Sequence, residues 1–198
     1  ALHTIGHAKE IVSKPSGADN KTRLMGIFIS GNYSWDNIIL GDVSIRFDGS
    51  SEFGSDSQWG SFWSVGGGIN VHNLKFMKAL PWLNQFKIRG TYGATGKVNY
   101  PPYAARDTYE VLFDDWYSTG VGATLQGIGN EKLVWEKTNT TNIGFDLSFF
   151  QSKYSLTFSW YNRQTVDMIT DVTIPSSAGF TSYKDNMGET RNRGYEIS

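Results

Sequence analysis

The sequence contains no cysteine, no long apolar run and almost no net charge, and each absence excludes a class of protein. Without cysteine there are no disulfides, no thiol catalysis and no Cys-ligated metal site. Without a run of about 18 apolar residues there is no membrane-spanning helix. A formal net charge of −1 provides no electrostatic footprint for nucleic acid, so we expect no nucleic-acid partner.

Aromatic residues and glycine, by contrast, are abundant. The chain of 198 residues is 15% aromatic and holds 7 Trp, 10 Tyr, 12 Phe and 22 Gly, while its mean hydropathy is only −0.37. A transmembrane β-barrel is compatible with such values, because its apolar residues are spread over short alternating segments and average out in hydropathy.

The clearest pattern is a pair of alternating runs within residues 138–168, on either side of Gln151. Apolar residues in the first run (Ile143, Phe145, Leu147, Phe149) and in the second (Tyr154, Leu156, Phe158, Trp160) alternate with polar or small ones. Period two is the pattern of β-strands, so the runs predict a hairpin with a tight turn at 151–153. Both exceed the usual ~5–6 residues of a globular strand. They suit the roughly 9–11 residues that cross a bilayer.

Similar patterns recur along the chain. They predict strands over 24–35, 39–47, 59–69 and 86–92, with a last strand opening at Tyr195 and Ile197, about seven in all. The connections are a tight turn at 36–37, a loop at 48–57, and a connector up to residue 84 with a short helical turn. Two longer irregular stretches are expected at 94–131 and 171–191. Residues 1–22 are predicted to be a polar loop.

Tight and long connections alternate in this scheme, which is the asymmetry of outer-membrane barrels, with short periplasmic turns and long extracellular loops. Seven strands, the last of them cut off, do not close a bacterial barrel, whose strand number is normally even. The fold class we predict is therefore all-β: an incomplete arc of a transmembrane antiparallel barrel, whose open edges are paired by strands outside this sequence.

Several segments resemble one family. The run SIRFDGSSEFG and the following WGSFWSVGGG, then FKIRGTYGATG, NEKLVWEKTNTTNIG, PSSAGFTS and NMGETRNRGYE, are similar in wording and order to segments of the SusC/RagA-type TonB-linked outer-membrane transporters of Bacteroidetes. They lie at 44–54, 59–68, 86–96, 130–144, 175–182 and 186–196. The resemblance covers the chain from about Arg23 to its end.

This resemblance implies a location in the cell outer membrane and a barrel of about 22 strands around a plug domain. It also implies import of oligosaccharides or peptides, using energy relayed by TonB through the plug, under a SusD-like surface lipoprotein. We find no plug, TonB box or C-terminal strands in the sequence. The expected organisation is a polar loop at 1–22 and a partial barrel at 23–198, in contact with outer-membrane lipid.

Two groups of residues are candidates for function. The first is an aromatic cluster in the stretch 94–131, whose rings suit stacking on sugars, contact with the lipoprotein, or packing within the loop itself. It consists of Tyr103, Tyr109, Phe113, Trp116 and Tyr117. The second is a set of polar residues whose strand parity points them to the lumen, where hydrogen bonding to one another or to the plug is expected. It consists of Arg46, Lys87, Arg89, Asn142, Asp146 and Arg163.

No catalytic residue, cofactor or metal site is predicted. Ser, His and Asp occur, but no nucleophile elbow does, and the three His lie outside the strand pattern. The main alternative is a soluble β-sandwich carbohydrate-binding module, which also shows alternation and exposed aromatics. Only a barrel predicts aromatics beside the short turns, such as Trp35, Phe149 and Tyr154. A closed eight-stranded barrel enzyme or adhesin is disfavoured by the truncated last strand.

Overall fold

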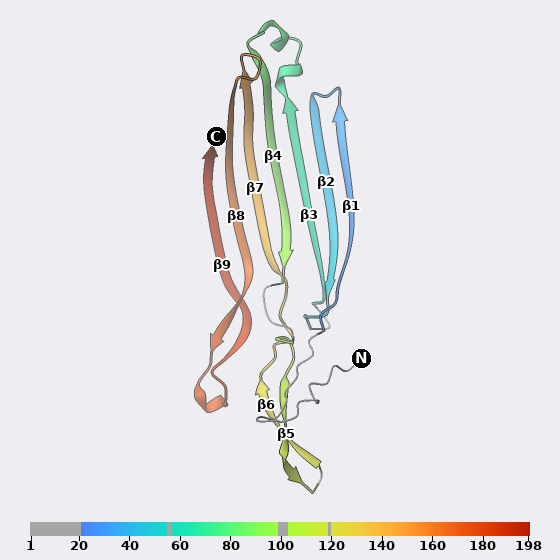
Figure 1. Cartoon of the computed structure of the whole chain (residues 1–198), viewed down its shortest axis with the longest axis vertical. Helices are drawn as coiled ribbons and strands as arrows, with labels where there is room; N and C mark the ends of the chain where they lie inside the picture. Colours follow the sequence, from blue (N-terminus) through green and yellow to red (C-terminus); the bar gives the residue numbers. More distant parts are fainter. Residues whose placement is uncertain (1–20, 55–56, 99–102, 119) are drawn as a thin grey trace, which may run out of the picture.

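The computed structural model describes residues 21–54, 57–98, 103–118 and 120–198; the expected polar loop at 1–22 lies almost entirely outside this part. Seven strands form one antiparallel sheet in the order β1-β2-β3-β4-β7-β8-β9 (Figure 1). Their bounds are β1 Leu24–Trp35, β2 Ile39–Ser50, β3 Trp59–Asn70, β4 Leu83–Lys97, β7 Glu136–Phe149, β8 Tyr154–Thr173 and β9 Ser182–Ile197. The prediction of about seven barrel strands is confirmed.

Two further strands, β5 (Thr108–Tyr117) and β6 (Gly120–Gly127), form a separate antiparallel hairpin. Three short 3₁₀ helices occur in the connections: η1 (Val71–Asn73), η2 (Met77–Ala79) and η3 (Ser176–Ala178). The helical turn expected before residue 84 is therefore of the 3₁₀ type. No helix within the described residues is long and apolar enough to cross a membrane.

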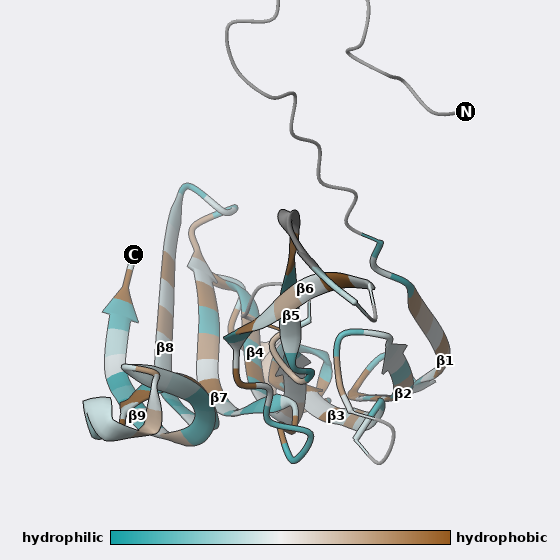
Figure 2. Cartoon of the chain, turned by 90° about the horizontal axis from the view of Figure 1, so that it is seen from below, coloured by the Kyte–Doolittle hydropathy of each residue, from teal (hydrophilic) through white to brown (hydrophobic). Residues whose placement is uncertain are grey.

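The large sheet has one apolar and one polar face, because its register keeps residues of one parity together across strands. The row Ile45, Trp63 and Ala94 lies on the apolar face, and the neighbouring row Ser44, Ser64 and Gly93 lies on the polar face. Figure 2 shows the resulting alternation of apolar and polar positions along β7 and β8.

The apolar face is exposed, with no other element of the described structure packed on it. Ile29 is 74% exposed, and Val43, Val65 and Ile143 are each about half exposed. Contiguous exposed apolar surface of this extent marks a surface that faces protein or membrane rather than water. Since no second sheet covers this face among the described residues, the β-sandwich alternative loses its core.

The sheet is open, with β1 and β9 at its two edges. Unpaired edges would leave main-chain N–H and C=O groups unsatisfied in a bilayer, so a membrane sheet must close through further strands. The arrangement is the predicted incomplete arc.

The two ends of the sheet differ. Figure 1 shows the β1–β2 and β7–β8 turns and the η1–η2 connector at one end, which we call the turn rim. At the other end, the loop rim, lie the β5–β6 hairpin and the extended β8–β9 connection. Aromatic rings gather at the turn rim, where Trp82 stacks on Phe149 at 5.8 Å and Phe150 meets Tyr154 edge-on at 6.2 Å. Trp35 ends β1 beside the first turn.

Two expected loops were wrong in extent. Residues 171–191 are mostly strand, because β8 and β9 continue their ladder with pairs such as Asp171 and Lys184, whose side chains form an ion pair at 2.8 Å. The stretch 94–131 is not irregular either: β4 runs to Lys97, paired with Glu136, and β5–β6 fills most of the remainder. Outside the membrane level both faces can be polar, so the alternation that identifies the other strands is missing.

A small buried core sits at the loop rim rather than along the sheet. It contains Phe53, Phe62, Ala105, Leu133, Trp135 and Ile169. Trp135 is its centre, stacked on Phe53 with ring centroids 4.7 Å apart and met edge-on by Phe62 at 5.5 Å. This core joins the β2–β3 loop to the segment that leads into β7.

Replacement of Trp135 tests the role of this core. Its indole Nε1 is buried and has no hydrogen-bond partner among the described residues. Trp135→Phe therefore loses no hydrogen bond and should lower the local-opening free energy of the loop rim by only about 1 kcal/mol, whereas Trp135→Ala should lower it by about 3–5 kcal/mol through cavity formation. Hydrogen exchange of residues 130–135 in the full-length protein measures both. Equal losses for the two variants would contradict this account.

Candidate functional site: the polar face and the outer hairpin

The centre of the polar face is Arg89, which links three strands. Its Nε donates to Asp146 Oδ2 at 3.2 Å and its Nη2 to Ser159 Oγ at 2.7 Å. Gly144 pairs in register with Arg89 on one side and with Ser159 on the other, so it lies between the guanidinium donor and its Ser159 acceptor. A Cβ at Gly144 would lie 3.4 Å from the guanidinium carbon and 3.1 Å from Ser159 Oγ, so the missing side chain lets Arg89 lie flat along the wall.

A polar hollow of about 480 Å³ opens beside this network and brings three of the predicted lumen residues together: Arg89, Asn142 and Arg163. Its remaining lining is Thr140, Ser159, Tyr161, Asn192 and Glu196. Tyr161 lies across Gly194, where a Cβ would approach its hydroxyl to 2.8 Å. Glycines on this face therefore hollow the wall and keep long polar side chains close to it.

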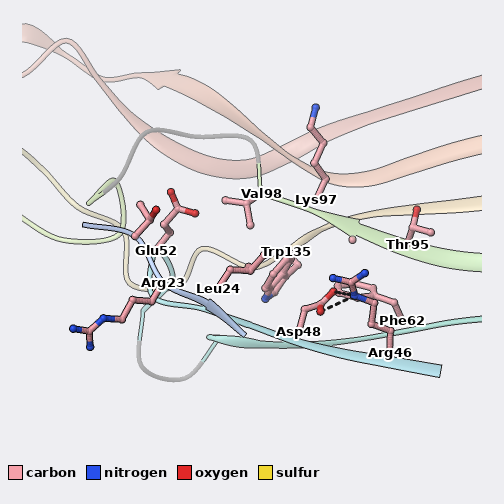
Figure 3. A pocket seen from close by; sticks show the side chains of 12 residues that line it. Arg23, Leu24, Arg46, Asp48, Glu52, Phe62, Thr95, Lys97, Val98 and Trp135 are labelled. Carbon is pink, nitrogen blue, oxygen red and sulfur yellow. Dashed lines mark hydrogen bonds and ion pairs between the residues drawn. The ribbon is translucent and has the colours of Figure 1, made fainter. Parts of the chain in front are cut away.

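The other predicted lumen residues occupy separate places. Lys87 lines a second hollow, of about 390 Å³, together with Asp42 and Arg89. Arg46 lies nearer the loop rim, where its Nε is 2.6 Å from Asp48 Oδ2. Figure 3 shows this ion pair at a pocket of about 540 Å³ that Leu24 and Trp135 also line.

Charges on the polar face are partly paired. Asp146 forms an ion pair with Arg89, and Asp48 forms one with Arg46. Lys87 and Arg163 make no ion pair with any described residue. Partly exposed ion pairs contribute only about 0–1 kcal/mol, so their main effect is to orient side chains. No group of three or more His, Asp or Glu within the described ranges is arranged to hold a metal ion.

The predicted aromatic cluster is divided by the structure. Tyr109 and Tyr117 lie on β5 and are 63% and 67% exposed. Tyr103 precedes the strand, and its hydroxyl accepts a hydrogen bond from the Lys21 backbone N–H at 3.2 Å, so it belongs to the base of the loop. Phe113 and Trp116 also lie on β5, but their side chains fall outside the described part of the structure.

The β5–β6 hairpin is itself one-sided. Tyr109 pairs with Leu125 and Val111 with Ala123, so these side chains share a face, and all four are exposed. An exposed apolar face on a hairpin beyond the membrane level suits contact with a ligand or a partner protein.

Two asparagines, which we call the asparagine anchors, fasten this hairpin to the sheet. Asn130 donates through Nδ2 to Lys184 O at 3.0 Å, and its backbone N–H donates to Ala104 O at 3.2 Å. Asn186 accepts from the Val134 N–H at 2.9 Å and donates to Val134 O at 3.0 Å. The anchors thereby join the segment after β6 to β9. Sequence reasoning missed them as functional positions, because a sequence pattern shows neither partner of a long-range hydrogen bond.

Comparison with known proteins identifies the class. Residues 7–198 match the family model described as TonB dependent receptor-like, beta-barrel. The chain therefore belongs to the TonB-dependent receptor β-barrel family. This is a family of outer-membrane transporters rather than enzymes. Outer-membrane barrels in general turn the apolar face of their strands toward lipid.

Particular relatives are the TonB-dependent receptor P39 of Formosa agariphila and the TonB-dependent receptor SusC of Bacteroides thetaiotaomicron. The chain is 32% identical to P39 over all of its own length and 19% of that protein. It is 32% identical to SusC over 90% of its own length and 18% of that protein. The chain thus spans about a fifth of the length of these relatives.

Solved structures agree. The RagAB peptide importer in its closed-closed state matches 88% of this chain and 19% of that chain, with a TM-score of 0.80 and 32% identity. The siderophore receptor PirA from Pseudomonas aeruginosa matches with a TM-score of 0.59 at 13% identity, which shows the fold alone. The resemblance to SusC/RagA-type proteins is confirmed, and the β-sandwich alternative is excluded by family membership.

Removal of an asparagine anchor tests how the hairpin is held. Asn186→Ala leaves the N–H and C=O of Val134 without their side-chain partner, which costs about 1–3 kcal/mol for a sheltered group. We expect faster hydrogen exchange at residues 130–135 and faster proteolysis of the β5–β6 hairpin in the full-length protein.

Asn192→Ala is the matched control, because Asn192 is exposed on the polar face of the same strand and lies outside the anchor contacts. Unchanged exchange in Asn186→Ala, or an equal increase in both variants, would contradict the anchoring role.

Proposed function

We propose that these residues form part of the wall and of the outer loops of a TonB-dependent outer-membrane importer of glycans or peptides. The observation that carries the proposal is the opposition of two faces on one open sheet: an apolar face that is bare, and a polar face hydrogen-bonded around Arg89. Likeness to SusC and to the RagAB peptide importer supports the transport class.

Residues 23–198 are proposed as the barrel part, and residues 1–22 as a polar segment before it. Further strands would come from the longer protein, since the sheet has two open edges. A plug domain is part of the proposal because of the likeness to SusC. TonB would act on the plug, and the residues described above would serve as a fixed wall.

The polar face suits such a wall. A wall that faces a plug or a hydrated substrate needs its polar groups satisfied, as a protein core does. Arg89 is bonded on two sides, whereas Lys87 and Arg163 are free of ion pairs among the described residues and are available to the plug or to a passing substrate. Arg46, Asn142 and Asp146 complete the proposed lumen-facing set.

The β5–β6 hairpin is proposed as the contact with substrate or with a SusD-like surface lipoprotein. Tyr109 and Tyr117 offer an apolar ring and a polar hydroxyl, which suits both sugar stacking and protein contact. Phe113 and Trp116 belong to the same proposed contact by their position on β5. Tyr103, bonded to the Lys21 backbone, would support the base of the hairpin.

A double substitution tests this contact. In the full-length protein, Tyr109→Ala with Tyr117→Ala should lower substrate uptake or lipoprotein affinity by about thirtyfold, which corresponds to the ~2 kcal/mol of an interface hot spot. Uptake by cells and lipoprotein recovery after detergent extraction separate the two contacts, because loss of uptake with full recovery indicates substrate.

The control is Glu110→Gln with Thr124→Ala, an exposed cross-strand pair on the opposite face of the same hairpin. If the tyrosine variant imports and recovers its lipoprotein like the control, the hairpin is not the contact.

A further inference from the structure

Cations lie on the apolar side of the sheet, just beyond the apolar band. On β7, β8 and β9 that band ends with the register row Ile143, Trp160 and Tyr195. The next row of the same face toward the loop rim is Thr141, Asn162 and Arg193, and the row after it is Asn139, Gln164 and Arg191. Lys137 stands one step further along β7. We call Lys137, Arg191 and Arg193 the outer basic patch.

Contacts, as well as the alternation of side chains along the strands, place the outer basic patch on the lipid side of the sheet. Arg191 Nε donates to Asn162 Oδ1 at 2.9 Å, and Asn162 has the parity of Trp160. Gly194, between Arg193 and Tyr195, faces the other way, beneath the Tyr161 ring on the polar face.

Positive charge prevails in the patch among the described residues. None of the three cations forms an ion pair there. Glu189, which accepts a hydrogen bond from Gln164 Nε2 at 2.6 Å, places one carboxylate beside Arg191, the partner of Gln164 in register, so three cations and one anion leave a net charge of +2. Arg191 and Arg193 are two residues apart on one strand face, roughly 7 Å from each other. Two like charges so close repel, and an anion placed between them removes that cost.

The level of the patch indicates which anion it meets. Trp160 and Tyr195 are amphipathic rings of the kind that mark a membrane interface. The cations lie on the loop-rim side of these rings, and the loop rim is the extracellular side of an outer-membrane barrel. A charge on the lipid face is costly at the bilayer midplane but nearly free at the interface. The patch is therefore at headgroup height in the outer leaflet.

We propose that the outer basic patch binds the phosphate group of an anionic lipid headgroup in the outer leaflet of the outer membrane. Arg191 and Arg193 supply guanidinium donors that match phosphate oxygens in pairs, and Lys137 adds a third charge. Asn139, Asn162 and Gln164 are neighbouring hydrogen-bond partners for the remaining headgroup hydroxyls. The inference depends on the apolar face meeting lipid and is independent of the proposed import function.

The test uses the full-length protein, stripped of lipid in detergent and titrated with phosphorylated lipid A under native mass spectrometry. Each neutralised charge should weaken binding by about fivefold, so Lys137→Gln with Arg191→Gln and Arg193→Gln should weaken it by about a hundredfold. Lipid A without phosphate should bind wild type as weakly as phosphorylated lipid A binds the triple variant. Inorganic phosphate should not bind measurably.

Two further variants complete the test, one as a control and one as a replacement for the triple variant. Arg163→Gln removes an exposed arginine from the polar face of β8 and should leave lipid binding unchanged. The single variant Arg193→Gln, with an expected fivefold loss, replaces the triple variant if that one does not fold.

Equal binding of phosphorylated lipid by wild type and variant would overturn the proposal, as would equal binding of the dephosphorylated lipid. If inorganic phosphate bound as tightly as the lipid, the ligand of the patch would be a free anion, and the lipid proposal would be overturned. A protein recovered on the patch in place of lipid would also overturn it.

Discussion

The structure depends on one constraint: a backbone that crosses a bilayer must satisfy every main-chain N–H and C=O within itself. Long antiparallel ladders meet this constraint across the seven strands of the sheet. Once the ladder is set, its period of two divides the side chains between a lipid face and an inner face. The bare apolar side, the hydrogen-bonded polar side and the two open edges all follow from this division.

Beyond the membrane level the constraint ends, and a different kind of stabilisation takes over. At the loop rim water can satisfy the backbone, so order there comes from a small core around Trp135 and from side-chain hydrogen bonds. Asn130 and Asn186 connect segments that are more than fifty residues apart in sequence. The β5–β6 hairpin is thus held in place by local packing and side-chain hydrogen bonds, whereas the large sheet is held by its backbone hydrogen-bond ladder.

The sequence predicts the membrane part well and the loop rim poorly, for the same reason. Alternation marked the β7–β8 hairpin and the parity of Arg89, Asn142 and Asp146, which the structure places on one face. The sequence did not predict the extension of β8 and β9, because around Asp171 and Lys184 both faces of the two strands carry polar residues. Arg191 then fell in a supposed loop and Lys137 just outside the predicted hairpin, so the outer basic patch was not visible. The hydrogen bond from Asn130 to Asp185 has no sequence signal at all.

The central claim is that odd-numbered residues of β7 face lipid and even-numbered ones face the lumen. Spin labels on single cysteines placed one at a time through residues 139–147 of the full-length protein, in lipid, test it directly. These 198 residues contain no cysteine, and any cysteine elsewhere in the full-length protein is replaced by serine beforehand. The account predicts that oxygen accessibility rises at Ile143 and Phe145 and falls at Asn142, Gly144 and Asp146, with a period of two. Uniform accessibility, or the opposite parity, would contradict it.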